Sequence, residues 1–220
     1  KYPAIVPPNV SSTQQLKLLL SVLSFGSVNH KFVDNGETVM ADLLGMDPGR
    51  IERLRSTDRL AYFDPAKIWP ILAPSANCTL VDIGAGVGFL TLPFAKSYPG
   101  AKVYGCDILE GMVGLLAEDA TNQGLGNLEA LLMQPNAIDL PDGTADIIVM
   151  AQLHHELDEP EPLMAECHRL LAPGGTIAII DWKDEDNGKS PAKGRRVPEM
   201  GMRRPFLFCT DDLFDFAISI

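Results

Sequence analysis

Three glycines at alternate positions follow an apolar segment and could bind a ligand through bare backbone. Residues 81–88 read Val-Asp-Ile-Gly-Ala-Gly-Val-Gly, and an apolar, helix-like stretch follows at residues 89–96. Glycine permits positive φ and lets a ligand touch the backbone, and a helix N-terminus offers unpaired N–H groups. We therefore expect a strand, a tight ligand-binding turn and a helix.

The spacing of these glycines bears on which nucleotide the turn binds. A dinucleotide-binding turn follows Gly-x-Gly-x-x-Gly, but the position where its third glycine would fall is Phe89. Further along, Asp107 lies 19 residues after Gly88, at the expected end of a second apolar strand. An acid there can accept both ribose hydroxyls of a nucleoside bound over the turn. The alternative is a strand-end acid that caps the next helix.

Two adjacent histidines follow the fourth apolar segment and could contact substrate or transfer a proton. Gln152, His154, His155 and Glu156 come after the apolar residues 145–150, and open α/β sheets bind ligands at the carboxyl ends of strands. A histidine with a pKa near neutrality could deprotonate an oxygen or nitrogen nucleophile, or it could be packed at a helix start with no chemical part. Adjacent residues rarely converge on one ion, so no metal is expected.

Alternating strands and helices must position these residues. Helical stretches are expected at 89–96, 109–120 and 163–171, and Pro93 should bend the first of them in its second turn. This alternation predicts an α/β fold, a Rossmann-like, doubly wound and mainly parallel sheet with helices on both faces. The expected strands are residues 79–83, 101–106, 128–133, 145–150 and 176–182, the last preceded by a Pro-Gly-Gly turn.

The composition indicates a globular protein with one main core. The 220 residues are 46% hydrophobic and 21% charged, which is typical of a folded chain. A net charge of −11 disfavours a broad electrostatic grip on nucleic acid, and no apolar run approaches the length of a membrane span. Four scattered cysteines without a Cys-x-x-Cys pair favour a reducing compartment, and we expect a cytoplasmic location.

Four motifs occur in one order within residues 79–182, about half of the chain. They are residues 81–88, Gly105-Cys106-Asp107, Leu140-Pro141-Asp142-Gly143-Thr144-Ala145-Asp146 and Leu170-Leu171-Ala172-Pro173-Gly174-Gly175. Together they resemble class I S-adenosylmethionine-dependent methyltransferases of the small-molecule group that includes quinone-biosynthesis enzymes. The resemblance implies S-adenosylmethionine as cofactor, S-adenosylhomocysteine as product and a small-molecule acceptor, whose nucleophile attacks the methyl group from the side opposite sulfur.

The resemblance also implies which residues bind the cofactor. The glycine turn should lie against its methionine part, and Asp82 could orient the turn through backbone N–H groups or reach the cofactor's ammonium through water. Many family members have an Asp that binds the adenine amino group where this chain has Asn136, whose oxygen could still accept. The predicted set is Asp82, Gly84, Ala85, Gly86, Gly88, Asp107, Ile108, Asn136, Ala137 and Gln152.

The resemblance implies a variable cap before the core and a hairpin after it. We predict an N-terminal extension and helical cap at residues 1–74, with helical segments at 16–25, 38–54 and 58–72, and the core at residues 75–220. A helix and an antiparallel hairpin should follow the fifth strand, yet residues 210–220 read as a single helix. The hairpin is therefore expected to be missing or altered, and truncation is favoured because an uncovered edge strand is a liability.

Two other functions stay open. An NAD(P)-dependent oxidoreductase would share the sheet, but it predicts a small residue in place of Phe89. A non-catalytic S-adenosylmethionine-binding protein would share the cofactor site. Arsenite methylation needs thiolates near the methyl group and is not expected, because Cys78 precedes the first strand and Cys167 lies on a helical core stripe.

Overall fold

The computed structural model describes residues 47–61, 63–182 and 215–219. Residues Pro48–Ile220 belong to one compact unit and Lys1–Asp47 to another. The predicted helix at 16–25 and most of the one at 38–54 lie outside the described residues, as does the segment between 183 and 214.

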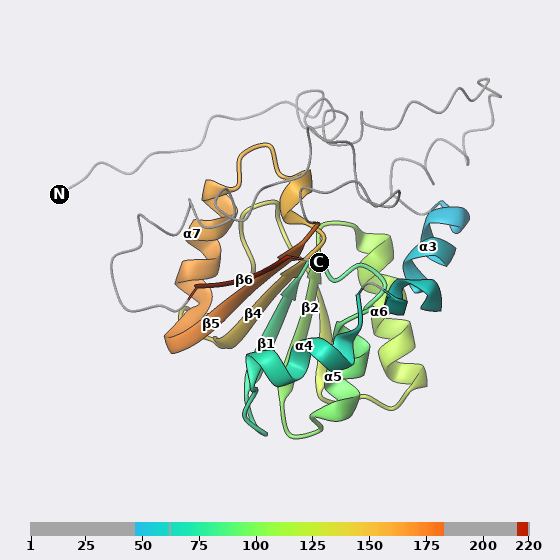
Figure 1. Cartoon of the computed structure of the whole chain (residues 1–220), viewed down its shortest axis with the longest axis horizontal. Coiled ribbons are helices and arrows are strands. Elements are labelled where there is room, and N and C mark those ends of the chain that lie inside the picture. Colours follow the sequence, from blue (N-terminus) through green and yellow to red (C-terminus); the bar gives the residue numbers. More distant parts are fainter. Residues whose placement is uncertain (1–46, 62, 183–214, 220) are drawn as a thin grey trace. The chain divides into compact units, whose positions relative to one another are not determined.

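A six-stranded sheet lies at the centre of the Pro48–Ile220 unit (Figure 1). Its order is β3-β2-β1-β4-β5-β6, and every neighbouring pair is parallel. The predicted doubly wound parallel sheet is therefore confirmed. The strands are β1 (Thr79–Ile83), β2 (Lys102–Asp107), β3 (Leu128–Leu132), β4 (Ala145–Ala151), β5 (Leu171–Asp181) and β6 (Asp215–Ser219).

Helices cover both faces of the sheet and leave two apolar cores. On one face, Trp69 and Phe94 from two helices pack against Leu80 and Val149 of the strands. On the other, Leu163 and Cys167 of a single helix pack against alternate residues of β1, β4 and β5. The helices are α3 (Pro48–Arg55), η1 (Thr57–Ala61), α4 (Pro65–Leu72), α5 (Thr91–Ser97), α6 (Glu110–Asn122), η2 (His154–Glu156) and α7 (Glu161–Leu170).

Prolines set where several helices begin. The predicted helical stretch at 58–72 is two helices, η1 and α4, because Pro65 occupies the first position of α4 and Asp64 caps it through Ala66 N–H. Pro93 is the third residue of α5, where its missing N–H breaks no intrahelical bond. The predicted bend in the second turn is therefore wrong, since α5 begins two residues later than expected.

The carboxyl-terminal edge differs from the prediction. Residues 215–219 form strand β6 rather than a helix, and β6 runs parallel to β5 from Ile177↔Asp215 to Asp181↔Ser219. The exposed N–H and C=O groups of β5 favour a paired strand over a local helix. The predicted Pro-Gly-Gly turn lies inside β5, where a register shift separates Leu171 from Thr176 in the pairing with β4.

The three N-terminal elements that the structure describes, α3, η1 and α4, lie in the same compact unit as the sheet. Arg55 of α3 forms an ion pair with Asp119 of α6 at 2.5 Å. The predicted division of the chain at residue 74 stays a prediction.

Candidate active site

The glycine turn leaves β1 and is fixed to the end of β2. The backbone N–H groups of Gly84 and Ala85 both donate to Cys106 O, at 2.8 and 3.0 Å. The positive φ of Gly86, +54°, lies in the left-handed region that favours glycine. The turn is thus held by backbone bonds to a neighbouring strand.

Only one of the three glycines faces open space. A Cβ on Gly84 would lie 2.9 Å from the Leu153 side chain, and one on Gly88 would lie 2.5 Å from that of Leu116. A Cβ on Gly86 would meet no atom of the described residues within 4 Å. Gly84 and Gly88 therefore permit close packing inside the protein, whereas Gly86 leaves bare backbone where a ligand could lie.

Asp107 connects this turn to the next helix. Its carboxylate accepts hydrogen bonds from Gly86 N and Leu109 N, both at 2.9 Å. Burial raises the pKa of Asp107, and the backbone donors act in the opposite direction. Each carboxylate oxygen keeps a second acceptor position, so helix capping and ribose binding are compatible roles. The adjoining Ile108 exposes an apolar side chain, 43% accessible, at the same strand end.

Asp82 lies buried in β1. The Thr91 hydroxyl donates to its Oδ2 at 2.5 Å, which joins β1 to the first residue of α5. Burial raises the pKa of Asp82 to about 7, although the Thr91 bond opposes this shift. The observed bond goes to a side chain of α5, and not to a backbone N–H group of the turn.

The segment predicted to contact adenine is a tight turn after β3. Gln134 N donates to Ala137 O at 2.9 Å, and Ala137 N points back to Gln134 O at 3.4 Å. Asn136 is exposed at its tip. Met133 N donates to Asp107 O at 2.9 Å, which places this turn beside the end of β2.

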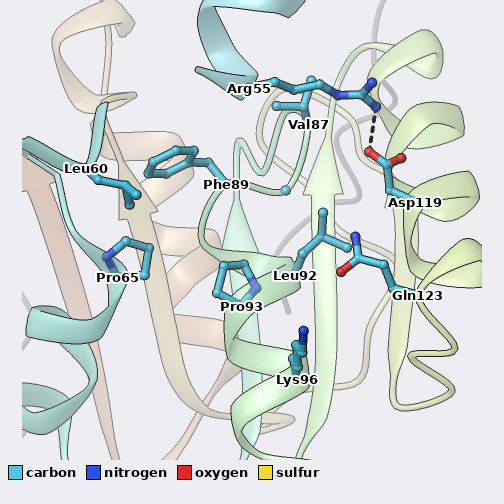
Figure 2. Close-up of a pocket in the computed structure, with 11 residues that line it drawn as sticks. Arg55, Leu60, Pro65, Val87, Phe89, Leu92, Pro93, Lys96, Asp119 and Gln123 are labelled. Atoms are coloured by element: carbon cyan, nitrogen blue, oxygen red, sulfur yellow. Dashed lines mark hydrogen bonds and ion pairs between the residues drawn. The ribbon is translucent and has the colours of Figure 1, made fainter. Parts of the chain in front are cut away.

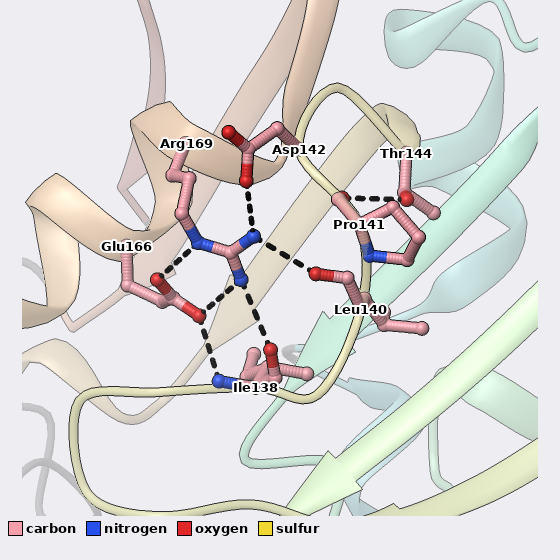
Figure 3. Close-up of polar contacts among 7 residues, drawn as sticks. All are labelled: Ile138, Leu140, Pro141, Asp142, Thr144, Glu166 and Arg169. Carbon is pink, nitrogen blue, oxygen red and sulfur yellow. Dashed lines mark hydrogen bonds and ion pairs between the residues drawn. The ribbon is translucent and has the colours of Figure 1, made fainter.

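Arg169 of α7 anchors the loop that follows this turn, a role that was not predicted from the sequence (Figure 3). Its guanidinium donates to Glu166 and Asp142 and to the carbonyl oxygens of Ile138 and Leu140, at 2.7–3.0 Å. Glu166 also accepts from Ile138 N at 2.7 Å, and hydrogen bonding with Arg169 lowers the pKa of Glu166 despite its burial. The i, i+3 spacing of Glu166 and Arg169 was the sequence signal available for this pair.

Gln152, directly after β4, has an unusual backbone and a constrained side chain. Its φ is +54°, which for a residue other than glycine costs on the order of 1–3 kcal/mol. Its N–H donates to Ile180 O at 2.7 Å, and its Oε1 accepts from Arg59 Nη2 at 2.7 Å. Its Nε2 is buried and has no hydrogen-bond partner among the described residues. Arg59 was not singled out in the sequence.

His155 is enclosed by carboxylates. Its Nδ1 lies 2.7 Å from Asp181 Oδ1 and its Nε2 lies 3.2 Å from Glu156 Oε1. Burial lowers the pKa of His155, but these two carboxylates outweigh burial and raise the pKa to about 9. The imidazole is therefore protonated at neutral pH and cannot accept a proton there.

The pKa of His154 is shifted in the opposite direction from that of His155. His154 is 3% exposed, and neither ring nitrogen has a hydrogen-bond partner in the described part of the chain. Burial lowers the pKa of His154. It is therefore a neutral imidazole near pH 7, next in sequence to a charged one.

A cavity of about 580 Å³ is lined by Gly88 but not by Gly86, Asp107 or Gln152 (Figure 2). Residues of α3, η1, α4, α5 and α6 line it, and the ion pair between Arg55 and Asp119 lies at its border. Of the predicted cofactor-binding residues it includes Gly88 alone. The cavity therefore lies outside the arrangement of Gly86, Asp107 and Gln152.

The carboxyl ends of four adjacent strands bring the predicted residues together. In the order β3-β2-β1-β4, they carry the Asn136 turn, Asp107, the glycine turn and Gln152. Open backbone at Gly86, acceptor oxygens on Asp107 and a Gln152 donor without a partner among the described residues suit a ligand with a ribose at one end and an amino acid at the other. These residues fit S-adenosylmethionine.

The described residues contain no group of three or more His, Cys, Asp or Glu side chains arranged to hold a metal ion. No helix among them combines the length and apolarity needed to cross a membrane.

The chain is similar to known methyltransferases in sequence and in fold. A family model described as a methyltransferase domain matches residues 81–179. The crystal structure of a SAM-dependent methyltransferase from Aquifex aeolicus is 35% identical with a TM-score of 0.70, over 74% of this chain and 88% of that one.

Curated relatives match over a smaller part of their length. A ubiquinone biosynthesis O-methyltransferase from Methylococcus capsulatus is 31% identical over 70% of this chain and 57% of its own. A demethylmenaquinone methyltransferase from Thermus thermophilus is 29% identical over 50% of this chain and 49% of its own. The chain spans about half the length of these relatives. Its parallel sheet, its glycine turn and the Aquifex structure together show that it belongs to the class I S-adenosylmethionine-dependent methyltransferases.

Proposed function

We propose that this protein transfers a methyl group from S-adenosylmethionine to a small-molecule acceptor by direct displacement. The observation that carries the proposal is the open face of Gly86, whose N–H is held by the Asp107 carboxylate. When bound, the cofactor supplies an electrophilic methyl group on a sulfonium. The protein supplies alignment and exclusion of water.

The predicted cofactor-binding residues contact different parts of the cofactor. Asp107 accepts from the ribose hydroxyls through its remaining acceptor positions, and Ile108 covers one face of the adenine. Asn136 and Ala137 bind the adenine edge. The turn from Gly84 through Ala85 and Gly86 to Gly88 lies against the methionine part, with Asp82 supporting it through Thr91.

The two histidines have different parts because their protonation states differ. His155 is a charged group fixed by Asp181, so we assign it a positioning role. His154, neutral and without a partner among the described residues, suits contact with the acceptor or removal of a proton from it. A base is needed only if the acceptor's nucleophile carries a proton that must leave.

A turnover assay tests this proposal. The chain is incubated with methyl-labelled S-adenosylmethionine and a panel of small acceptors that begins with hydroxylated aromatic and quinone precursors. Labelled product and S-adenosylhomocysteine should appear together, and only with a matching acceptor. Cofactor binding without transfer across the panel would instead favour a non-catalytic binding protein.

We further propose a cytoplasmic protein that acts without nucleic acid. Cys78, Cys106 and Cys167 are buried free thiols, in keeping with a reducing compartment. The net charge of −11 opposes association with a polyanion.

A further inference from the structure

Arg59 of η1 forms a direct connection to the end of β4, 93 residues further along the chain. Its Nη2 donates to Gln152 Oε1 at 2.7 Å, and its Nη1 donates to Leu54 O at 2.8 Å. A side chain of the N-terminal elements is thereby bonded to a residue of the proposed cofactor site.

Two aromatic rings hold the guanidinium in place. Arg59 Cζ lies 4.1 Å from the centroid of the Phe89 ring and 5.6 Å from that of Phe63. The two rings are stacked, with centroids 5.6 Å apart. Phe63 N also donates to Arg59 O at 2.7 Å. Stacking of this kind fixes the plane of a guanidinium and so the direction of its donors.

This arrangement decides which end of the Gln152 amide faces the ligand. A guanidinium can only donate, so Gln152 must turn Oε1 toward Arg59 and Nε2 away from it. Nε2 is buried without a partner among the described residues, a condition that proteins rarely tolerate unless an ordered water, an ion or a ligand satisfies the group. The positive φ of Gln152 and its backbone bond to Ile180 restrict the side chain further.

The order of the strands indicates which part of the cofactor this donor meets. Asp107 ends β2 and Gln152 follows β4, on opposite sides of β1. The side chain of Leu153, next to Gln152, packs on Gly84. A cofactor with its ribose at Asp107 and its chain across the glycine turn brings its amino-acid end to Gln152, where a carboxylate is the natural acceptor for an amide N–H.

We propose that Arg59 is a positioning residue, which orients the Gln152 amide so that Nε2 donates to the carboxylate of the cofactor's methionine part. This inference rests on the proposed function, since it requires that S-adenosylmethionine or its product binds between Asp107, the glycine turn and Gln152. If the Arg59 contact orients Gln152, then cofactor affinity depends on the position of η1, which carries Arg59.

Three variants of the full chain separate orientation from general stability. Gln152→Glu keeps an acceptor for Arg59 but replaces the Nε2 donor with an oxygen. Arg59→Met keeps an apolar stem against Phe89 but releases the amide. Arg55→Met is the matched control, because it removes another arginine contact of the N-terminal elements, the pair with Asp119, without touching Gln152.

Calorimetric titration compares S-adenosylhomocysteine with 5′-methylthioadenosine, which lacks the amino-acid carboxylate. Gln152→Glu and Arg59→Met should each weaken binding of S-adenosylhomocysteine by about tenfold or more and change the affinity for 5′-methylthioadenosine less than about twofold. Arg59→Lys, which can still donate to Oε1, should recover part of the loss. The effects of Gln152→Glu and Arg59→Met should be less than additive in the double variant.

The possible failures are distinguishable. Equal losses for both ligands in Arg59→Met would show a merely structural role and overturn the inference, as would unchanged binding of S-adenosylhomocysteine in either variant. If the wild-type chain binds neither ligand, the proposed function itself fails. Thermal unfolding of each variant establishes that it is folded before titration.

Discussion

At the scale of single residues, Gly86 and Gly124 have similar backbone conformations and lie in different parts of the fold. Their φ angles are +54° and +67°, and in the part of the chain that the structure describes a Cβ on either would meet no atom within 4 Å. Gly86 lies in the turn after β1, whereas Gly124 lies in the loop after α6. A methyl group should strain the two backbones alike, but only at Gly86 should it obstruct a ligand.

We therefore predict a loss of cofactor affinity in Gly86→Ala that Gly124→Ala does not show. Each substitution should lower the free energy of unfolding by about 1–2 kcal/mol because of the positive φ. The Kd for S-adenosylhomocysteine should rise at least about tenfold in Gly86→Ala and less than about twofold in Gly124→Ala. Calorimetry and denaturant unfolding measure both quantities, and equal Kd values in the two variants would refute the ligand assignment.

His155 predicts a specific pH dependence of stability. Its pKa is raised from 6.5 to about 9 in the folded protein, so folding favours the protonated form. The resulting stabilisation is complete below pH 6.5 and is lost as the pH rises through about 9. It amounts to about 3 kcal/mol, because the pKa is raised by about 2.5 units and each unit corresponds to about 1.4 kcal/mol.

Denaturant unfolding between pH 6 and pH 9.5 checks this. The wild-type free energy of unfolding should fall over that interval, and His155→Gln should fall less steeply. His168→Gln is the matched control, because His168 is exposed on α7. A His155→Gln profile parallel to that of the wild type would contradict the buried ion pair with Asp181.

At the scale of elements, α7 both covers the sheet and holds a loop of the site. Leu163 and Cys167 contribute to the core, while Arg169 binds the loop from Ile138 to Asp142. The Asn136 turn precedes this loop directly. The position of the proposed adenine contact therefore depends on a side chain more than 30 residues away.

Arg169→Met should loosen this loop. The free energy of unfolding should fall by about 2 kcal/mol, since several charge-assisted bonds are lost and Glu166 is left buried without its cation. Amide exchange at Ile138, whose N–H donates to Glu166, should accelerate. Lys102→Met, which removes an exposed pair with Glu129, should cost less than about 1 kcal/mol and leave Ile138 unchanged. Unaltered exchange at Ile138 in Arg169→Met would show that the loop is held by other means.

Elements with continuous apolar runs could be predicted from the sequence, whereas the C-terminal strand could not. The predicted range 79–83 agrees with β1 in full, and β4 extends one residue beyond its prediction, because both segments are mostly apolar, as buried parallel strands are. Residues 215–219 read Asp-Phe-Ala-Ile-Ser, an apolar run too short to distinguish a strand from a helix, and their pairing with β5 overrides a local helical pattern. Such pairing is a long-range property that periodicity does not express.

At the scale of the whole molecule, the sheet brings residues from distant parts of the chain together at the carboxyl ends of its strands. Motif spacing located Gly86 and Asp107, because a strand, a turn and an acid recur at fixed distances in this fold. The contact between Arg59 and Gln152 was not predicted, although Gln152 itself was. Arg59 and Gln152 are 93 residues apart, and no pattern in the sequence joins them before the chain is folded.

The central claim is that S-adenosylmethionine binds at the carboxyl ends of β3, β2, β1 and β4, and calorimetric titration of the wild-type chain tests it most directly. S-adenosylmethionine and NAD are titrated separately under identical conditions. The account predicts saturable binding of one S-adenosylmethionine per chain and no binding of NAD, in keeping with Phe89 at the position where a dinucleotide turn has glycine. Saturable binding of NAD, or no heat with S-adenosylmethionine, would contradict it.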